Sequence, residues 1–117
     1  EVSYIHSDAY QAGELKHGTI SLIKDGTIVF AIATDDDIRD KTISNLEEVK
    51  SRGAKTIIIS NEKIEGYDLC ITVPKISMYF QAILIVPVLQ LIAYEVAKLR
   101  GCDIDKPKNL AKSVTVE

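Results

Sequence analysis

The sequence predicts an α/β fold with a mostly parallel β-sheet flanked by helices, and three features lead to this prediction. Two runs rich in β-branched residues, 27–33 and 56–60, are typical of strands buried on both faces of a parallel sheet. An amphipathic helical pattern lies between them, and a long apolar helix follows a third short run at 69–73. Strands that alternate with helices indicate layered α/β packing.

The elements before the second strand follow from local signals. Residues 1–17 carry apolar side chains at roughly helical spacing and predict a helix that weakens near Gly13. The Asp25-Gly26 pair predicts a turn before the strand at 27–33. Polar residues 34–37 offer caps for a helix of about 15 residues, and Gly53 is expected just past its end.

The carboxyl-terminal half is dominated by the apolar pattern of residues 80–99. This pattern predicts a long helix in which Pro87 should introduce a kink or a break. Its first half is apolar almost all round, which predicts burial in a larger core or against another subunit. The stretch 80–94 is interrupted by Gln81, Pro87 and Gln90 and is shorter than the roughly 20 residues of a membrane span, so no membrane association is expected.

Length, charge and cysteine content limit the class of protein. The 117 residues suffice for one small domain, which we assign to 1–102, with a polar tail at 103–117. The net charge of −3 argues against a nucleic-acid binder. Two cysteines, Cys70 and Cys102, are expected to be free thiols in the cytoplasm. Because the chain starts without methionine and inside a helical pattern, we expect it to be a piece of a longer protein.

The three consecutive aspartates at 35–37 admit two interpretations. A helix cap that also interacts with the helix dipole is favoured. A metal site is the alternative, and it is disfavoured because no histidine or further carboxylate cluster lies nearby in the sequence.

Three segments resemble the glucosamine-6-phosphate synthase family, the isomerizing glutamine:fructose-6-phosphate aminotransferases. They are Glu-Leu-Lys-His-Gly at 14–18, the terminal string Asn-Leu-Ala-Lys-Ser-Val-Thr-Val-Glu at 109–117, and residues 1–6, which resemble the segment with the catalytic glutamate. The resemblance implies a three-layer sugar isomerase (SIS) fold, here a truncated second SIS subdomain plus the carboxyl-terminal tail. Thr19 departs from the family, which usually has proline there. The family's phosphate-binding serines and threonines lie in the first SIS subdomain, which these residues do not include.

The resemblance also implies a reaction, the conversion of fructose-6-phosphate and glutamine-derived ammonia into glucosamine-6-phosphate, the first committed step of amino-sugar synthesis. Lys112 would form the Schiff base with the sugar ketone. Glu1 would move the proton from C1 to C2. His17 would assist ring opening from the neighbouring subunit of a homodimer, and the backbone of Ala111 would contact the substrate. The resemblance implies no metal and no cofactor, and it makes the first SIS subdomain and a glutaminase domain partners of this chain.

Three alternatives remain open. The first is another sugar-phosphate isomerase or deglycase on the same fold, against which Lys112 argues, because a plain isomerase needs no imine. The second is a non-catalytic module that binds a sugar phosphate, which has no need of Glu1, His17 and Lys112 together. The third is a purely structural role in oligomerisation. Taken alone, the chain is expected to be inactive and to self-associate through an exposed sheet edge.

The remaining polar residues of the resembling segments have simpler interpretations. His6 is expected to be a surface or packed histidine, and Lys16 with Glu14 is expected to form a solvated or interface pair.

Overall fold

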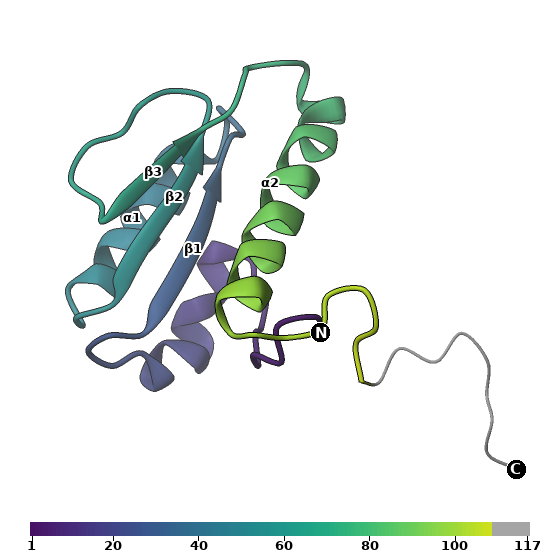
Figure 1. Ribbon diagram of the computed structural model, residues 1–117. Helices are drawn as coiled ribbons and strands as arrows, with labels where there is room; N and C mark the ends of the chain where they lie inside the picture. Colours follow the sequence, from purple (N-terminus) through teal and green to yellow (C-terminus); the bar gives the residue numbers. More distant parts are fainter. Residues whose placement is uncertain (109–117) are drawn as a thin grey trace, which may run out of the picture. The chain divides into compact units, whose positions relative to one another are not determined.

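The computed structural model describes residues 1–108, and the chain divides into two compact units. The sheet unit is Ala9–Ile85, and the terminal unit joins Glu1–Asp8 to Val86–Glu117. The long helix α2, Met78–Leu99, starts in the sheet unit and continues into the terminal unit (Figure 1). The predicted boundary between residues 102 and 103 stays a prediction.

The sheet unit contains three parallel strands in the order β1-β2-β3 (Figure 1). They are β1, Ile28–Ala33, β2, Lys55–Ser60, and β3, Leu69–Thr72. Each begins and ends within one residue of its predicted position. The α/β fold with a parallel sheet is therefore confirmed. In register, Ala33 lies opposite Ser60 and Ser60 lies opposite Thr72, so all three strands end at one edge of the sheet.

Helix α1, Arg39–Lys50, packs on one face of the sheet and closes the core. Ala33, Leu46 and Ile58 form the buried centre, and the inward side chains of β1, among them Val29 and Ala31, pack around it. These positions alternate along β1, as the two-residue period of a strand requires.

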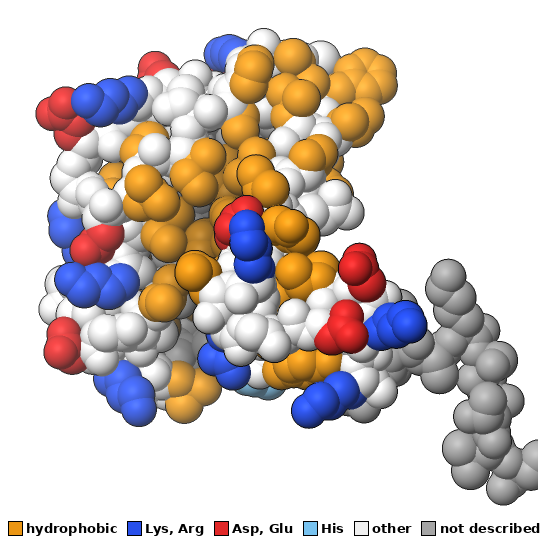
Figure 2. All heavy atoms as spheres, in the orientation of Figure 1, with side chains coloured by type: hydrophobic (Ala, Val, Ile, Leu, Met, Phe, Trp, Pro, Cys, Tyr) orange, Lys and Arg blue, Asp and Glu red, His pale blue; other side chains and the backbone are white. Residues whose placement is uncertain are grey.

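The opposite face of β1 is exposed. Ile28, Phe30 and Ile32 leave 64%, 42% and 45% of their surface accessible. The prediction that this strand is buried on both faces is therefore wrong for the described residues, where β1 is an edge strand covered by α1 on one face. Figure 2 shows hydrophobic side chains gathered over the sheet. An exposed apolar strand face of this kind is a surface on which another polypeptide can pack.

The start of α1 differs from its prediction, whereas its end agrees. The helix has 12 residues, and its N-cap position is Ile38, which offers no side-chain cap. Asp35 instead accepts a hydrogen bond from the backbone N–H of Asp37, at 3.0 Å, in a turn ahead of the helix. Beyond the helix, Gly53 has φ +85°, and a Cβ there would lie 2.8 Å from Oδ1 of Asp25. The predicted glycine stop is confirmed.

The amino-terminal residues do not form the predicted α-helix. Only two short 3₁₀ helices are found there, η1 at Ala12–His17 and η2 at Thr19–Leu22. Val2 and Ile5 lie outside both, and the Tyr4 backbone has φ 52°, which an α-helix does not permit. The apolar spacing alone was insufficient, because short helices need a packed apolar face to be stable.

Helix α2 is one continuous element of 22 residues with Pro87 inside it, so proline does not split it. Many of its apolar side chains are exposed within the described residues, so the predicted burial in a larger core or against another subunit stays a prediction. The most exposed are Met78, Tyr79, Phe80, Ile83, Leu91 and Leu99. By length and composition the helix could cross a membrane, with mean hydropathy 1.8. The argument that this segment is too short to span is therefore wrong, and the absence of membrane association stays a prediction.

Candidate active site

Charged side chains from three loops meet at the carboxyl ends of the strands. Asp36 follows β1, Glu62 follows β2 and Lys75 follows β3. Lys75 and Arg39 both pair with Asp36, the latter at 3.7 Å, and Arg39 also reaches Glu62 at 2.8 Å. Ligands of open α/β sheets bind beyond this edge. This edge of the sheet unit is therefore a candidate site.

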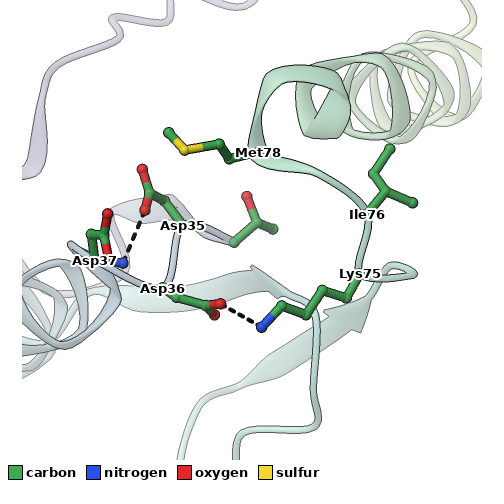
Figure 3. A pocket seen from close by; sticks show the side chains of 7 residues that line it. Asp35, Asp36, Asp37, Lys75, Ile76 and Met78 are labelled. Carbon is green, nitrogen blue, oxygen red and sulfur yellow. Dashed lines mark hydrogen bonds and ion pairs between the residues drawn. The ribbon is translucent and has the colours of Figure 1, made fainter.

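An open cavity of about 220 Å³ lies beside this network. It is lined by Thr34, Asp35, Asp36, Asp37, Lys75, Ile76 and Met78. In Figure 3, Asp36 and Lys75 point toward one another, and the Asp35 carboxylate turns back to the Asp37 backbone. The Lys75 hydrogen bond lowers the pKa of the Asp36 carboxyl below its ordinary value, so that group is ionised at neutral pH.

The charge of this cavity disfavours a phosphate ligand. Three carboxylates line it against one lysine, and that lysine is already paired with Asp36. A phosphate group would meet net negative charge here. The cavity therefore offers no cradle for the phosphate of a sugar substrate.

Two buried or half-buried amides fix the loop that leads into α2. Nδ2 of Asn61 donates to the Pro74 carbonyl and to Oε1 of Gln81, at 3.3 and 3.2 Å. Gln81 donates in turn to Pro74 and accepts from the Ile76 backbone N–H, both at 3.3 Å. Gln81, an apparent interruption of the apolar pattern, thus anchors the start of the helix to the end of β2.

His17 lies in the sheet unit at the end of η1, where its side chain is exposed. The preceding Lys16 pairs with Glu48 of α1, Nζ to Oε1 at 2.8 Å. The expected Lys16–Glu14 pair is therefore wrong: the lysine reaches across to the neighbouring helix. This ion pair fastens the 3₁₀ helix that presents His17. His6, in the terminal unit, pairs with Asp8 at 3.1 Å and has the surface position predicted for it.

Glu1 lies in the terminal unit, at the start of a tight turn. Its side chain is exposed, and its carbonyl oxygen accepts a hydrogen bond from the Tyr4 backbone N–H at 3.2 Å. The Tyr4 hydroxyl accepts a hydrogen bond from the Lys108 backbone N–H at 2.7 Å. The segment that begins with Glu1 is therefore joined to the segment that leads into the carboxyl-terminal tail.

The chain between α2 and the tail is held by local hydrogen bonds. Gly101, at φ 68°, and Cys102 donate to the carbonyls of Lys98 and Ala97, at 3.0 and 2.9 Å, which is a Schellman stop. Asp103 then accepts from the backbone N–H groups of residues 105 and 106, at 3.1 and 2.9 Å. The chain therefore reaches Lys108 on a defined course.

The predicted site residues are distributed as follows. Glu1 is in the terminal unit and His17 is in the sheet unit. Lys112 and Ala111 lie outside the described residues. The Tyr4–Lys108 contact was missed from the sequence, because the two residues are 104 positions apart and neither has a motif that links them. Within residues 1–108, no group of three His, Cys, Asp or Glu side chains has the arrangement of a metal site.

A parallel three-stranded sheet with a crossover helix and polar side chains beyond its carboxyl edge defines the class of layered α/β domains. Residues 1–100 match the family described as the SIS domain, and the chain belongs to this family.

Relatives with a known name cover the whole chain. It is 53% identical to the glutamine–fructose-6-phosphate aminotransferases [isomerizing] of Clostridium acetobutylicum and Clostridium tetani, over 100% of this chain and 20% of each relative. The Bacillus subtilis protein of the same name is 49% identical over the same shares. The chain thus spans about one fifth of the length of these relatives.

The fold of the chain is also similar to that of a solved structure. It is the C-terminal domain of glucosamine-fructose-6-phosphate aminotransferase from Francisella tularensis, with TM-score 0.82 and 34% identity. The match covers 89% of this chain and 30% of that chain. The resemblance drawn from three short segments is therefore confirmed along the chain.

Proposed function

We propose that the chain is the carboxyl-terminal part of a glutamine–fructose-6-phosphate aminotransferase and works in its sugar isomerase half, in the cytoplasm. The 53% identity across the full chain to proteins of that name supports the proposal. The remaining four fifths of such a protein would supply what this chain lacks, including the first SIS subdomain with the phosphate cradle and the glutaminase domain.

In this proposal, fructose-6-phosphate and ammonia give glucosamine-6-phosphate and water. The Lys112 amine adds to the open-chain C2 ketone and expels water to form an iminium ion. Ammonia then displaces the lysine from C2 by transimination, which restores the lysine amine and leaves the protonated C2 imine of the sugar. Glu1 takes the proton from C1, which is acidic beside this charged C=N, and returns it to C2, which gives the C1 aldehyde and the C2 amine of glucosamine-6-phosphate. His17, from the neighbouring subunit of a homodimer, would exchange protons with the ring oxygen and hydroxyl during ring opening, and the Ala111 backbone would contact the sugar.

The observation that carries the proposal is the 2.7 Å contact of the Tyr4 hydroxyl with the Lys108 backbone. It joins the residue three positions after Glu1 to the residue four positions before Lys112. A proton transfer next to an imine needs the base and the imine lysine at the same substrate, although they are 111 positions apart in sequence (positions 1 and 112). The contact joins the segment that carries Glu1 to Lys108, the described residue four positions before Lys112 in the sequence, and in this way supports the proposal.

The test uses the full-length protein that carries this chain. Borohydride is added with fructose-6-phosphate, and the reduced adduct is mapped by mass spectrometry. We expect the adduct on Lys112, and none in the Lys112→Arg variant, because the guanidinium stays protonated and forms no imine. Sugar binding without an adduct would contradict the proposal and favour a non-catalytic SIS module or a plain isomerase.

A second experiment tests whether this chain needs the rest of the protein. The purified 117-residue chain is incubated with fructose-6-phosphate and ammonia. We expect no glucosamine-6-phosphate, because the phosphate cradle belongs to the other SIS subdomain. Turnover by the chain alone would contradict the assignment of the phosphate-binding residues to the other SIS subdomain.

A further inference from the structure

Tyr4 makes two contacts with Lys108 and has an unusual backbone conformation. Its hydroxyl accepts the Lys108 backbone N–H at 2.7 Å. Its ring lies under the Lys108 ammonium, with Nζ 5.9 Å from the ring centre. Among the described residues it is the one non-glycine residue with positive φ, at 52°. Bulky side chains rarely adopt this left-handed backbone, so the surrounding contacts must hold it there.

The turn at Glu1 explains how the conformation is maintained. The Tyr4 backbone N–H donates to the Glu1 carbonyl at 3.2 Å, and the next residue back, Ser3, is buried, with its carbonyl 4.0 Å from the Cys102 thiol. The left-handed residue therefore closes the turn and sends its ring toward Lys108. The Lys108 contact depends on the Tyr4 hydroxyl, whereas the Glu1–Tyr4 hydrogen bond is made by backbone atoms alone.

Lys108 is the last described residue before Lys112 in the sequence. The bonds of Asp103 fix the chain up to residue 106, and the Tyr4 bond is the last described contact before residues 109–117. Four residues of fully extended chain span at most about 14 Å, so the Lys112 backbone can lie no farther than this from Lys108.

We propose that Tyr4 is a positioning residue for Lys112: it ties the stem of the tail to the turn that carries Glu1, so that the base and the imine lysine meet at one substrate. This inference rests on the proposed function. Tyr4 contacts neither the substrate nor the reacting atoms. Its role is to hold Lys108, four positions before the imine lysine, beside the turn that carries Glu1.

The test compares Tyr4→Phe with wild type in the full-length protein. The variant keeps the ring and loses the oxygen that accepts the Lys108 N–H. Hydrogen exchange measures that single amide, and borohydride trapping measures the rate of adduct formation at Lys112. We expect the Lys108 amide to exchange about five-fold faster, and trapping and kcat to fall by a similar factor, the ratio set by one ordinary hydrogen bond. KM should stay constant, because the phosphate is held elsewhere.

Two further variants keep the result interpretable. Tyr10→Phe removes the hydroxyl of a residue that is 50% exposed and lies in the sheet unit, and it should change neither exchange at Lys108 nor kcat. Tyr4→Ala also removes the ring and should lower kcat further, with KM again unchanged. A purely structural role would instead reduce the amount of folded protein and leave kcat per folded molecule at the wild-type value, which would overturn the inference.

The outcomes separate this inference from the proposed function. Unchanged exchange at Lys108 in Tyr4→Phe overturns the inference, and so does faster exchange with unchanged trapping, while Lys112 remains the imine lysine. Absence of any adduct in wild type overturns both proposals together.

Discussion

The carboxylate of Asp68 accepts a hydrogen bond from the backbone N–H of Thr56 at 2.8 Å and from its hydroxyl at 3.2 Å. Thr56 is fully buried in β2, and Asp68 immediately precedes β3. The carboxylate satisfies a buried donor that would otherwise cost free energy, and it also fixes where β3 starts beside β2.

Replacing Asp68 by alanine should therefore loosen this edge of the sheet. We expect the Thr56 amide to exchange several-fold faster in Asp68→Ala, and less so in Asp68→Asn, which keeps an acceptor oxygen of the same length. Hydrogen exchange in the full-length protein measures the effect at the single amide. Equal exchange in all three proteins would contradict the bond.

The same carboxylate predicts a pH dependence. The Thr56 backbone hydrogen bond, with a smaller contribution from Lys55, lowers the pKa of Asp68 from its ordinary value. Because the pKa is lower in the folded state, the stabilisation is present above the unfolded-state value and is lost as the pH falls through the folded-state value. Thermal unfolding from about pH 6 to about pH 3 should bring wild type and Asp68→Asn closer together at the acid end. A difference that grows in acid would contradict the assignment.

Tyr67 predicts the opposite dependence at alkaline pH. Burial, with a smaller contribution from a hydrogen bond to Glu47, raises the pKa of Tyr67 to about 12. The contribution is complete below the ordinary tyrosine pKa of about 10 and is lost as the pH rises through the folded-state value. In an alkaline titration, the near-ultraviolet absorbance of tyrosinate that wild type shows in excess of Tyr67→Phe should therefore appear only near the alkaline end. A difference that is complete at about pH 10 would refute it.

Local patterns were sufficient for the regular elements. The strands were located within one residue because continuous β-branched runs have few alternatives, and Gly101 stopped α2 where its positive φ permits a Schellman turn. The helix expected at residues 1–17 failed because its apolar spacing forms no buried face: no residue of η1 is buried, although η1 lies against α1. The exposure of Phe30 could not be predicted either, since an edge strand awaiting a cover has the same composition as a central one.

The candidate site was less accessible to sequence reasoning. Glu1, His17 and Lys112 came from resemblance, and their roles stay predictions. The contacts that support them, from Tyr4 to Lys108 and from Lys16 to Glu48, join residues far apart in the chain. No period or motif encodes such contacts, because they depend on how the elements pack.

The exposed face of β1 predicts self-association of the isolated chain. Ile28, Phe30 and Ile32 present alternate apolar side chains on an edge strand, a surface that pairs readily with another copy. Sedimentation of the 117-residue chain should show species larger than a monomer, and replacing all three residues by threonine, which keeps strand propensity, should shift the distribution toward monomer. A well-behaved wild-type monomer would refute the prediction.

The Lys16–Glu48 pair predicts a small and salt-sensitive effect on activity. It holds η1, which ends at His17, against α1, and its side chains are 50% and 40% exposed. An exposed pair contributes about 0.2–1 kcal/mol, so Glu48→Gln should lower kcat of the full-length protein by about five-fold at most. Because high salt already screens the pair, the kcat values of wild type and Glu48→Gln should converge at high salt.

The kcat loss of Glu48→Gln is to be compared with that of His17→Ala, which removes the proposed proton donor itself. If His17 moves the ring-opening proton, its removal should cost about 10²-fold or more in kcat, far beyond the loss of its support. Supplying the open-chain form of the substrate would bypass that step, and should restore His17→Ala more than Glu48→Gln. A Glu48→Gln loss as large as that of His17→Ala, unaffected by salt, would mean that Glu48 acts on the reaction itself and that the ion pair is incidental.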